Sequence, residues 1–348
     1  MAKKKKKKRK NLKRRKVNKK RKNLKRRKVN KKRKKLKRKI KVKKTTKQND
    51  LIFKVPSKWS RTAYVDKKKY EKKYKLSIKD NEEFWRKEGK RIDWIKPYKK
   101  IKDVKYSKTE VKIKWFYDGT LNASANCIDR HLPTKKNKNA IIWIGDNPND
   151  SKNITYKDLH KNVCKTANGL KAIGVKKGDR VTIYLTMIPE LAYVMLACAR
   201  IGAIHSIIFG GFSPDSISGR INDCKSDYIV TADEGVRGGK IIPLKKIADE
   251  ALEKCPNIKK CIVVKRTGNE INWVEGRDVW YNDIILTASD KCVAEEMSAE
   301  DPLFILYTSG STGKPKGVLH TTGGYMVYAS MTHQYIFDYK KNDIYWCS

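Results

Sequence analysis

One segment of the sequence combines the residue types that bind phosphate groups. Directly after the apolar run 304–306, residues 307–318 read Tyr-Thr-Ser-Gly-Ser-Thr-Gly-Lys-Pro-Lys-Gly-Val. Glycines let the backbone approach a ligand closely, while hydroxyls and lysines donate hydrogen bonds and positive charge to phosphate oxygens. Because a flexible linker rarely follows a buried strand this closely, the segment predicts a loop that holds the phosphates of a nucleotide.

This segment differs from the P-loop of nucleotide triphosphatases. In that motif a glycine stands five positions before the glycine that precedes the lysine, and a Ser or Thr follows the lysine. Here Thr308 stands at the first of these positions and Pro315 at the second. Proline also disfavours a helix that begins directly at Lys314. The sequence therefore indicates a phosphate-binding loop of another kind.

The elements that must position this loop alternate between short apolar strands and helical patterns. Thr155 can cap a helix that ends near Gly174, and Pro189 opens a helix that ends near Gly202. This alternation predicts an α/β fold with a parallel sheet covered on both faces, whose ligand sites lie at the carboxyl ends of the strands. The expected strands are 111–115, 140–143, 181–185, 205–208, 228–231, 261–264 and 303–307, with a further helix over 214–223.

The charge of the chain is concentrated at its N-terminus. The 348 residues carry a formal charge of +48, and 31 of the first 44 residues are Lys or Arg with no acidic residue among them. Residues 9–20 are repeated without change as residues 21–32. The few apolar residues of this segment bury too little surface to offset the conformational entropy lost on ordering. We therefore expect a disordered tail. Residues 1–44 could bind nucleic acid non-specifically, or their charge could be incidental.

Composition also excludes several classes of protein. The longest uncharged apolar run, 191–199, is far shorter than the ~20 residues that span a bilayer. Eight cysteines at irregular spacings indicate reduced, mostly buried thiols. The five histidines lack metal-ligand spacing, and no pair of nucleophile and base can be identified. We therefore predict a cytoplasmic protein with no membrane segment, no metal site and no certain catalytic residue.

The phosphate-binding segment resembles the signature of the AMP-forming acyl-CoA synthetases, which are part of the adenylate-forming superfamily. Within them the chain looks like the acetyl-CoA synthetase family from about residue 70 to residue 348. The resemblance implies the N-terminal portion of the large adenylate-forming domain, with parallel sheets flanked by helices. The segments that carry it are 115–122, 125–132, 195–212, 233–240, 300–325 and 343–347.

The resemblance also implies a domain organisation and a reaction. Residues 1–48 would form the disordered tail, 49–135 an N-terminal cap region, and 136–348 an incomplete AMP-binding domain. The implied reaction joins acetate and ATP into acetyl-adenylate and pyrophosphate, after which CoA displaces AMP. Acetate, ATP and CoA are then the small-molecule substrates, and Mg²⁺ accompanies ATP.

Two sets of site residues follow from the same resemblance. The implied ATP phosphate-binding residues are Thr308, Ser309, Gly310, Ser311, Thr312, Gly313, Lys314 and Lys316. The implied CoA-binding residues are Arg237, Gly238, Gly239 and Lys240, with Phe209, Gly210 and Gly211 beside them. Lysine at 240 replaces the arginine usual in the family. The alternative interpretation of residues 237–240 is a charged surface turn. The alternative interpretation of residues 209–211 is a turn in the core.

Members of the family are about twice as long as this chain, so little catalysis is expected from these 348 residues alone. The residues that size the acyl pocket would lie beyond Ser348. Propionyl-CoA synthetase, or another short-chain acyl-CoA synthetase, is therefore an alternative. A non-catalytic remnant whose basic arm binds nucleic acid is an alternative from another class.

Overall fold

The structure is a computed structural model that describes residues 53–309 and 313–347. The chain divides into two compact units, residues 1–62 and 63–348. Of the first unit the structure describes the exposed helix α2 (Ser57–Thr62) and the residues that lead into it. The predicted tail over 1–48 lies outside the described residues, so its expected disorder stays a prediction.

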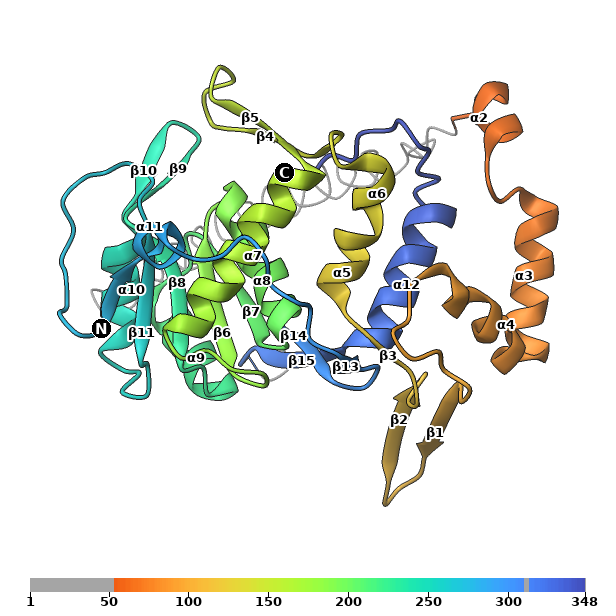
Figure 1. Cartoon of the computed structure of the whole chain (residues 1–348). Coiled ribbons are helices and arrows are strands. Elements are labelled where there is room, and N and C mark those ends of the chain that lie inside the picture. The colour runs from red at the N-terminus through yellow and green to blue at the C-terminus, as the bar shows by residue number, and fades with distance from the viewer. Residues whose placement is uncertain (1–52, 310–312, 348) are drawn as a thin grey trace, which may run out of the picture. The chain divides into compact units, whose positions relative to one another are not determined.

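The second unit is built on a seven-stranded sheet in which six strands are parallel (Figure 1). Only the edge strand β15 runs antiparallel to its neighbour β14. The fold class predicted from the sequence is therefore confirmed, with a mixed rather than purely parallel sheet. In spatial order the strands are β12 (Asp278–Trp280), β11 (Lys260–Val264), β8 (Tyr228–Ala232), β6 (Arg180–Leu185), β7 (Ile204–Phe209), β14 (Pro302–Thr308) and β15 (Lys316–Thr321).

Helices cover both faces of this sheet. From β6 to β7 the chain steps in one direction across the sheet, whereas from β7 to β8 and from β8 to β11 it steps in the other. Because such crossovers are right-handed, α8 lies on one face and α9 and α10 lie on the opposite face. Helices α7 and α11 pack on the side of α8. The helices are α7 (Tyr156–Ala172), α8 (Pro189–Ile201), α9 (Pro214–Cys224), α10 (Leu244–Leu252) and α11 (Tyr281–Leu286).

Local signals in the sequence set the ends of these helices. The Thr155 hydroxyl accepts the N–H of Asp158, and the Asp158 carboxylate accepts the N–H of Thr155, which is a capping box. Helix α8 begins at Pro189, and Gly202 after its last residue is left-handed with φ 74°. Both predicted helices are thus confirmed, for the reasons that the sequence suggested.

Two predicted strands lie outside the main sheet. The strand expected over 140–143 is β4 (Asn139–Ile144), which pairs antiparallel with β5 (Ser151–Thr155) in a separate ribbon. The strand expected over 111–115 is β2 (Val111–Trp115), which pairs antiparallel with β1 (Lys102–Tyr106). The predicted strand over 111–115 is confirmed. A place in the parallel sheet is wrong for the strand over 140–143, because a strand pattern alone does not specify the pairing partner.

The segment before β4 forms a second packing centre with the last described helix. Buried apolar side chains from residues 92–121 contact Ala299 and Val327, the latter on α12 (Thr322–Tyr335). The elements here are α3 (Lys67–Lys79), α4 (Asn81–Glu88), β3 (Thr120–Leu121), α5 (Ala123–Cys127), α6 (Leu132–Lys135), β13 (Met297–Ser298) and the 3-10 turns Gly89–Arg91 and Asp129–His131. Residues far apart in sequence therefore close this end of the unit.

Protonation of the buried His205 is expected to make the fold sensitive to pH. Its side chain on β7 is 6% exposed and stacks on Phe304, and its Nδ1 has no partner among the described residues. Burial lowers the pKa of His205 to about 4. The unfolded chain binds this proton near pH 6.5, so stability falls as the pH drops from about 6.5 towards 4. We expect a loss of about 2 kcal/mol between pH 7 and pH 5.

Urea denaturation of wild type and of His205→Gln at both pH values measures this contribution. Because glutamine does not titrate, the variant should lose clearly less stability than wild type over this range. An equal loss in both proteins would show that other groups cause the pH dependence.

Candidate functional site

The segments predicted to bind ligands lie in loops at one edge of the sheet. Residues 209–211 begin at the last residue of β7, residues 237–240 come after β8, and residues 308–313 begin at the last residue of β14. These three strands are parallel, so the three loops leave the sheet at the same, carboxyl edge. The chain turns from β6 to one face of the sheet and from β7 to the other. Ligands of open α/β sheets bind at such a switch point.

The predicted phosphate loop joins β14 to β15. Thr308, the last residue of β14, pairs with Lys316, the first residue of β15. Thr308, Ser309, Lys314 and Lys316 are exposed, and among the described residues neither lysine has an ion-pair partner. Gly310, Ser311 and Thr312 lie outside the described residues. Because a strand and not a helix follows the loop, the distinction from the P-loop is confirmed.

Tyr307 anchors the near end of this loop to helix α9. Its hydroxyl donates to Oδ2 of Asp223 at 2.6 Å. Burial and this hydrogen bond raise the pKa of Tyr307, so the phenol stays protonated and remains a donor. The residue directly before Thr308 is therefore fixed.

Arg220 connects the phosphate loop with the loop after β7. Its guanidinium carbon lies 4.9 Å from the centre of the Phe212 ring and 5.4 Å from that of the Tyr307 ring. Its Nη1 donates to the backbone oxygen of Ser216 at 2.6 Å, one helical turn earlier. Arg220 is not among the residues predicted from the sequence, although its spacing from Ser216 and Asp223 places all three on one side of a helix.

The predicted CoA loop is the turn of a short hairpin. Strands β9 (Gly235–Arg237) and β10 (Lys240–Ile242) pair antiparallel, with Arg237 opposite Lys240. Gly238 and Gly239 have φ of 58° and 72°, so both central residues are left-handed as in a type I′ turn. An added Cβ would meet no atom within 4 Å at either position, so the backbone angles and not the available space favour glycine here.

The two predicted parts of the CoA site contact each other. The Arg237 guanidinium carbon lies 4.6 Å from the centre of the Phe209 ring, and this ring is 51% exposed. The N–H of Gly211 donates to the buried Tyr184 hydroxyl, which donates to the Phe212 backbone oxygen. An exposed aromatic ring beside an arginine and a lysine could stack on a base and bind its phosphate.

The loop after β11 is held beside this hairpin by Asp233, which is not among the site residues predicted from the sequence. Its buried carboxylate accepts backbone N–H groups from Glu234, Arg266, Thr267 and Gly268. This contact joins the carboxyl ends of β8 and β11. Because the Asp233 carboxylate accepts only backbone N–H groups, its role is to support the loops.

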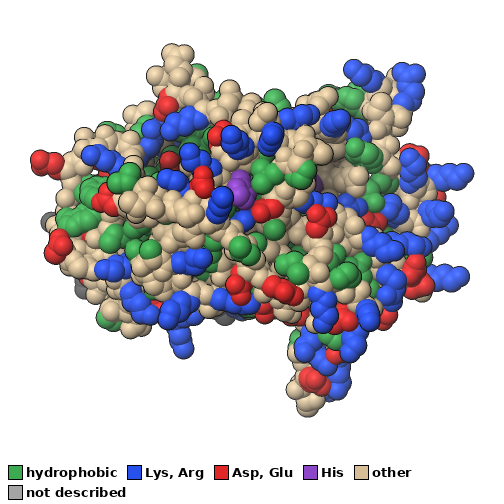
Figure 2. Space-filling model, in the orientation of Figure 1, with side chains coloured by type: hydrophobic (Ala, Val, Ile, Leu, Met, Phe, Trp, Pro, Cys, Tyr) green, Lys and Arg blue, Asp and Glu red, His purple; other side chains and the backbone are tan. Residues whose placement is uncertain are grey.

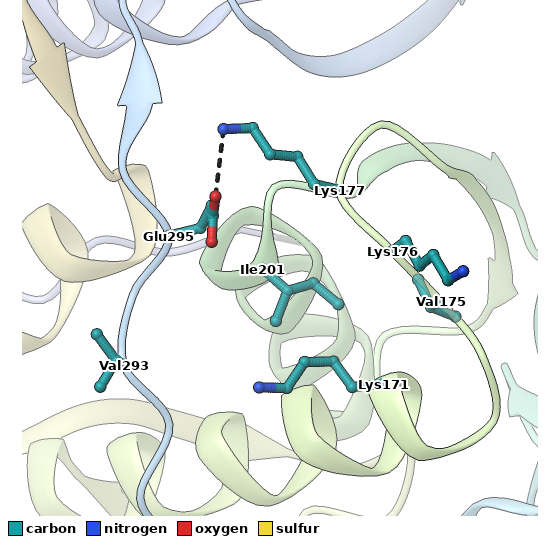
Figure 3. Close-up of a pocket in the computed structure, with 7 residues that line it drawn as sticks. All are labelled: Lys171, Val175, Lys176, Lys177, Ile201, Val293 and Glu295. Carbon is teal, nitrogen blue, oxygen red and sulfur yellow. Dashed lines mark hydrogen bonds and ion pairs between the residues drawn. The ribbon is translucent and has the colours of Figure 1, made fainter.

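A cavity of about 290 Å³ lies at the opposite edge of the sheet (Figure 3). It is bordered by the residues that precede β6, and Lys177 Nζ lies 3.3 Å from a Glu295 oxygen. None of the residues predicted to bind ATP or CoA lines it. The cavity is lined by Lys171, Val175, Lys176, Lys177, Ile201, Val293 and Glu295.

Charge on the surface does not by itself mark the site. Figure 2 shows acidic and basic side chains intermixed over the visible face, with Lys and Arg numerous over α3 and the β1–β2 ribbon.

Within the described ranges, no three His, Cys, Asp or Glu side chains are grouped as they would be around a metal ion. The described helices include none that is long and apolar enough to cross a membrane.

Two protein families match consecutive parts of the chain. Residues 70–127 match the acetyl-coenzyme A synthetase N-terminus family, and residues 128–348 match the AMP-binding enzyme family. The second match covers more than half of the chain and includes all three candidate loops. The family resemblance expected from the sequence is therefore confirmed.

Individual relatives agree with this assignment. The chain is 65% identical over 300 residues to an acetyl-coenzyme A synthetase of Parvibaculum lavamentivorans, covering 86% of this chain and 46% of the relative. It is 60% identical over 301 residues to one of Methylocella silvestris, covering 86% and 47%. The chain thus spans about half the length of the curated relatives it matches.

A solved structure has the same fold. An acetoacetyl-CoA synthetase from Streptomyces lividans superposes with a TM-score of 0.68 over 75% of this chain and 39% of that one, at 24% identity. At this identity the likeness supports the fold alone.

Proposed function

The chain belongs to the AMP-binding enzyme family, and from that premise we propose that it forms the N-terminal half of an AMP-forming acetate–CoA ligase. The contact of Arg237 with Phe209, on the same sheet edge as the 308–316 loop, is the observation that carries this proposal. It joins the two segments that are proposed to bind CoA. Acetate as the acyl substrate is supported by the 59–65% identity to acetyl-coenzyme A synthetases.

In the proposed reaction a carboxylate oxygen of acetate attacks the α-phosphorus of ATP. The bond from that phosphorus to the bridging oxygen breaks, and pyrophosphate leaves with the electron pair. The thiolate sulfur of CoA then attacks the carbonyl carbon of acetyl-adenylate. The bond from that carbon to the phosphate oxygen breaks, and AMP leaves with the electron pair. Anions must approach each other in the first step, so the chain must supply positive charge and N–H donors around the leaving group.

The residues of the 308–316 loop are proposed to meet this need. Lys314 and Lys316 would donate to the β- and γ-phosphate oxygens, while Thr308 and Ser309 add hydroxyl donors. Gly310, Ser311, Thr312 and Gly313 complete the proposed set of phosphate-binding residues. Mg²⁺ would enter bound to ATP, where it neutralises part of the phosphate charge.

The loop 237–240 is proposed to bind the 3′-phosphate end of CoA, with Phe209, Gly210 and Gly211 beside the adenine. Arg237 and Lys240 face each other across a two-residue turn, so both could approach a single phosphate group.

The unpaired cysteines, most of them buried, support a cytoplasmic location. Residues 1–44 lie outside both matched segments, so no nucleic acid binding is proposed for them.

A chimaera tests the proposal directly. Residues 63–348 are followed by the remaining half of the Parvibaculum relative, and acetate-dependent exchange of pyrophosphate into ATP is measured. Exchange that requires acetate, followed by CoA-dependent release of AMP, is the expected result. A folded chimaera that binds neither ATP nor CoA would contradict the proposed function.

Replacing Arg237 by alanine should weaken CoA binding about tenfold and leave ATP binding unchanged. The guanidinium is exposed and stacked on Phe209, so its loss removes a phosphate donor without opening the core. Arg237→Lys should be intermediate, because lysine keeps the charge but lacks the planar fork of donors. Isothermal titration of CoA and ATP into the chain measures both affinities. Equal losses for the two ligands would instead indicate a role in folding.

A further inference from the structure

The turn of the β9–β10 hairpin binds a carboxylate from a distant part of the chain. Asp146 lies in the loop between β4 and β5, and its Oδ1 accepts the N–H of Gly238 at 2.8 Å. Its Oδ2 accepts the N–H of Gly239. Both oxygens of one carboxylate are therefore bound by two successive backbone donors of the predicted CoA loop.

The geometry of the turn explains this contact. Gly238 and Gly239 are both left-handed, and successive N–H groups in such a turn point to one side and form a small anion-binding concavity. The hydrogen bonds from Gly239 and Gly238 hold the pKa of Asp146 below its usual range. The carboxylate is thus the anion that this turn binds.

The loop that carries Asp146 is anchored independently of the hairpin. Trp143 Nε1 donates to the backbone oxygen of Met187 at 2.7 Å, just beyond the end of β6. Asp150 forms an ion pair of 2.9 Å with Arg266, whose guanidinium lies over the Trp143 ring. Asp146 therefore reaches the turn from a support that is itself fixed to the carboxyl edge of the sheet.

The hairpin has few contacts of its own that could fix its turn. Each of its strands has three residues, and the side chains of Arg237 and Lys240 are exposed. Two-stranded hairpins of this size are marginally stable in isolation. A bidentate carboxylate on the turn restricts its backbone, and with it the directions in which the two flanking cations project.

We propose that Asp146 is a positioning residue for the CoA loop: by binding both glycine N–H groups it holds Arg237 and Lys240 directed at the 3′-phosphate of CoA. This inference rests on the proposed function, because the phosphate it serves is the one assigned to that loop. The backbone donors of the turn are occupied by Asp146, so phosphate recognition depends on the two side chains. Asp146 itself would not touch the ligand.

Titration of CoA and of 3′-dephospho-CoA into the full chain tests this role. The two ligands differ only in the phosphate, so their affinity ratio reports on the positioned cations and not on general folding. In Asp146→Ala the affinity for CoA should fall about tenfold, while that for 3′-dephospho-CoA changes less than twofold. Asp146→Asn keeps one acceptor oxygen and should lie between wild type and alanine.

Asp290→Ala is the matched control, because Asp290 is exposed and has no hydrogen bond among the described residues. It should keep the wild-type ratio. If Asp146→Ala keeps the wild-type preference for CoA over 3′-dephospho-CoA, the proposed role of Asp146 is overturned, but the assignment of the loop to CoA is not. Tighter CoA binding in that variant would also overturn it, since the carboxylate would then compete with the phosphate. If wild type itself does not prefer CoA, the assignment of the loop to CoA fails as well.

Discussion

Replacing Lys245 by methionine should destabilise the fold by about 3 kcal/mol or more. Lys245 on α10 is fully buried, and its ammonium group lies 2.8 Å from Oδ2 of Asp278 and 2.8 Å from Asp249. It also donates to the backbone oxygen of Asn272. Removing one partner of a buried ion pair leaves the other charge without compensation, which typically costs about 3–5 kcal/mol. Arg277 still contacts both carboxylates, which favours the lower end of this range.

Urea denaturation of Lys245→Met and of Lys246→Met measures the effect. Lys246 is the next residue of the same helix and is exposed, so its replacement should change stability by less than about 0.5 kcal/mol. The double variant Lys245→Met with Asp278→Leu should recover part of the loss, because no buried charge then lacks its partner. Equal stabilities of the two single variants would show that the buried ion pair contributes nothing.

The same ion pair predicts how the fold responds to acid. Burial alone would raise the pKa of Asp278, but hydrogen bonds from Arg277 and Lys245 outweigh burial and lower it. An aspartate with a lowered pKa stabilises the folded state above the pKa of the unfolded chain. Its contribution is therefore lost only below about pH 4, in contrast to that of His205, which is lost between about pH 6.5 and pH 4.

Elements whose pattern is local can be predicted from the sequence. Pro189 and Gly202 predict helix α8, and the cap at Thr155 predicts helix α7, because capping and left-handed glycine depend on neighbouring residues. Strands β6 and β8 are buried along nearly their whole length, and most of their residues are apolar. In contrast, β4 matches the same pattern but pairs in a ribbon, since pairing is decided by distant residues.

The candidate site divides in the same way. Glycines, hydroxyls and lysines after an apolar strand are enough to predict the loop after β14 from its own residues. The loops after β7 and β8 are predicted only from the family resemblance. The residues that hold these loops cannot be found in this way, because Asp146 contacts residues more than 90 positions away. Lys245 likewise has the appearance of a surface charge on an amphipathic helix until its burial is known. The sequence can therefore predict candidate ligand contacts, whereas the residues that support them depend on tertiary structure.

Replacing Lys316 by alanine should slow acetate-dependent exchange of pyrophosphate into ATP by about 100- to 1,000-fold in the chimaera with the Parvibaculum half. A donor aimed at charge that develops in the transition state typically contributes about 2.7–4 kcal/mol. Lys316 begins β15 and pairs across the hairpin with Thr308, so a strand rather than the loop tip fixes its backbone. Its side chain is exposed, and its removal should leave the stability of the fold unchanged.

The size of the effect on exchange, compared with that on ATP binding, separates two roles of Lys316. If the ammonium group stabilises the departing pyrophosphate, the exchange rate falls much more than the affinity for ATP, because only transition-state interactions alter the rate at saturating substrate. If the ammonium group only attracts the polyanionic ATP, the affinity for ATP and the exchange rate at low ATP concentration fall together. Saturating ATP then restores the exchange rate. Lys341→Ala, a change at another exposed lysine, controls for the loss of one positive charge. Unaltered exchange in Lys316→Ala would exclude this lysine from the phosphate site and leave Lys314 as the cation of the loop.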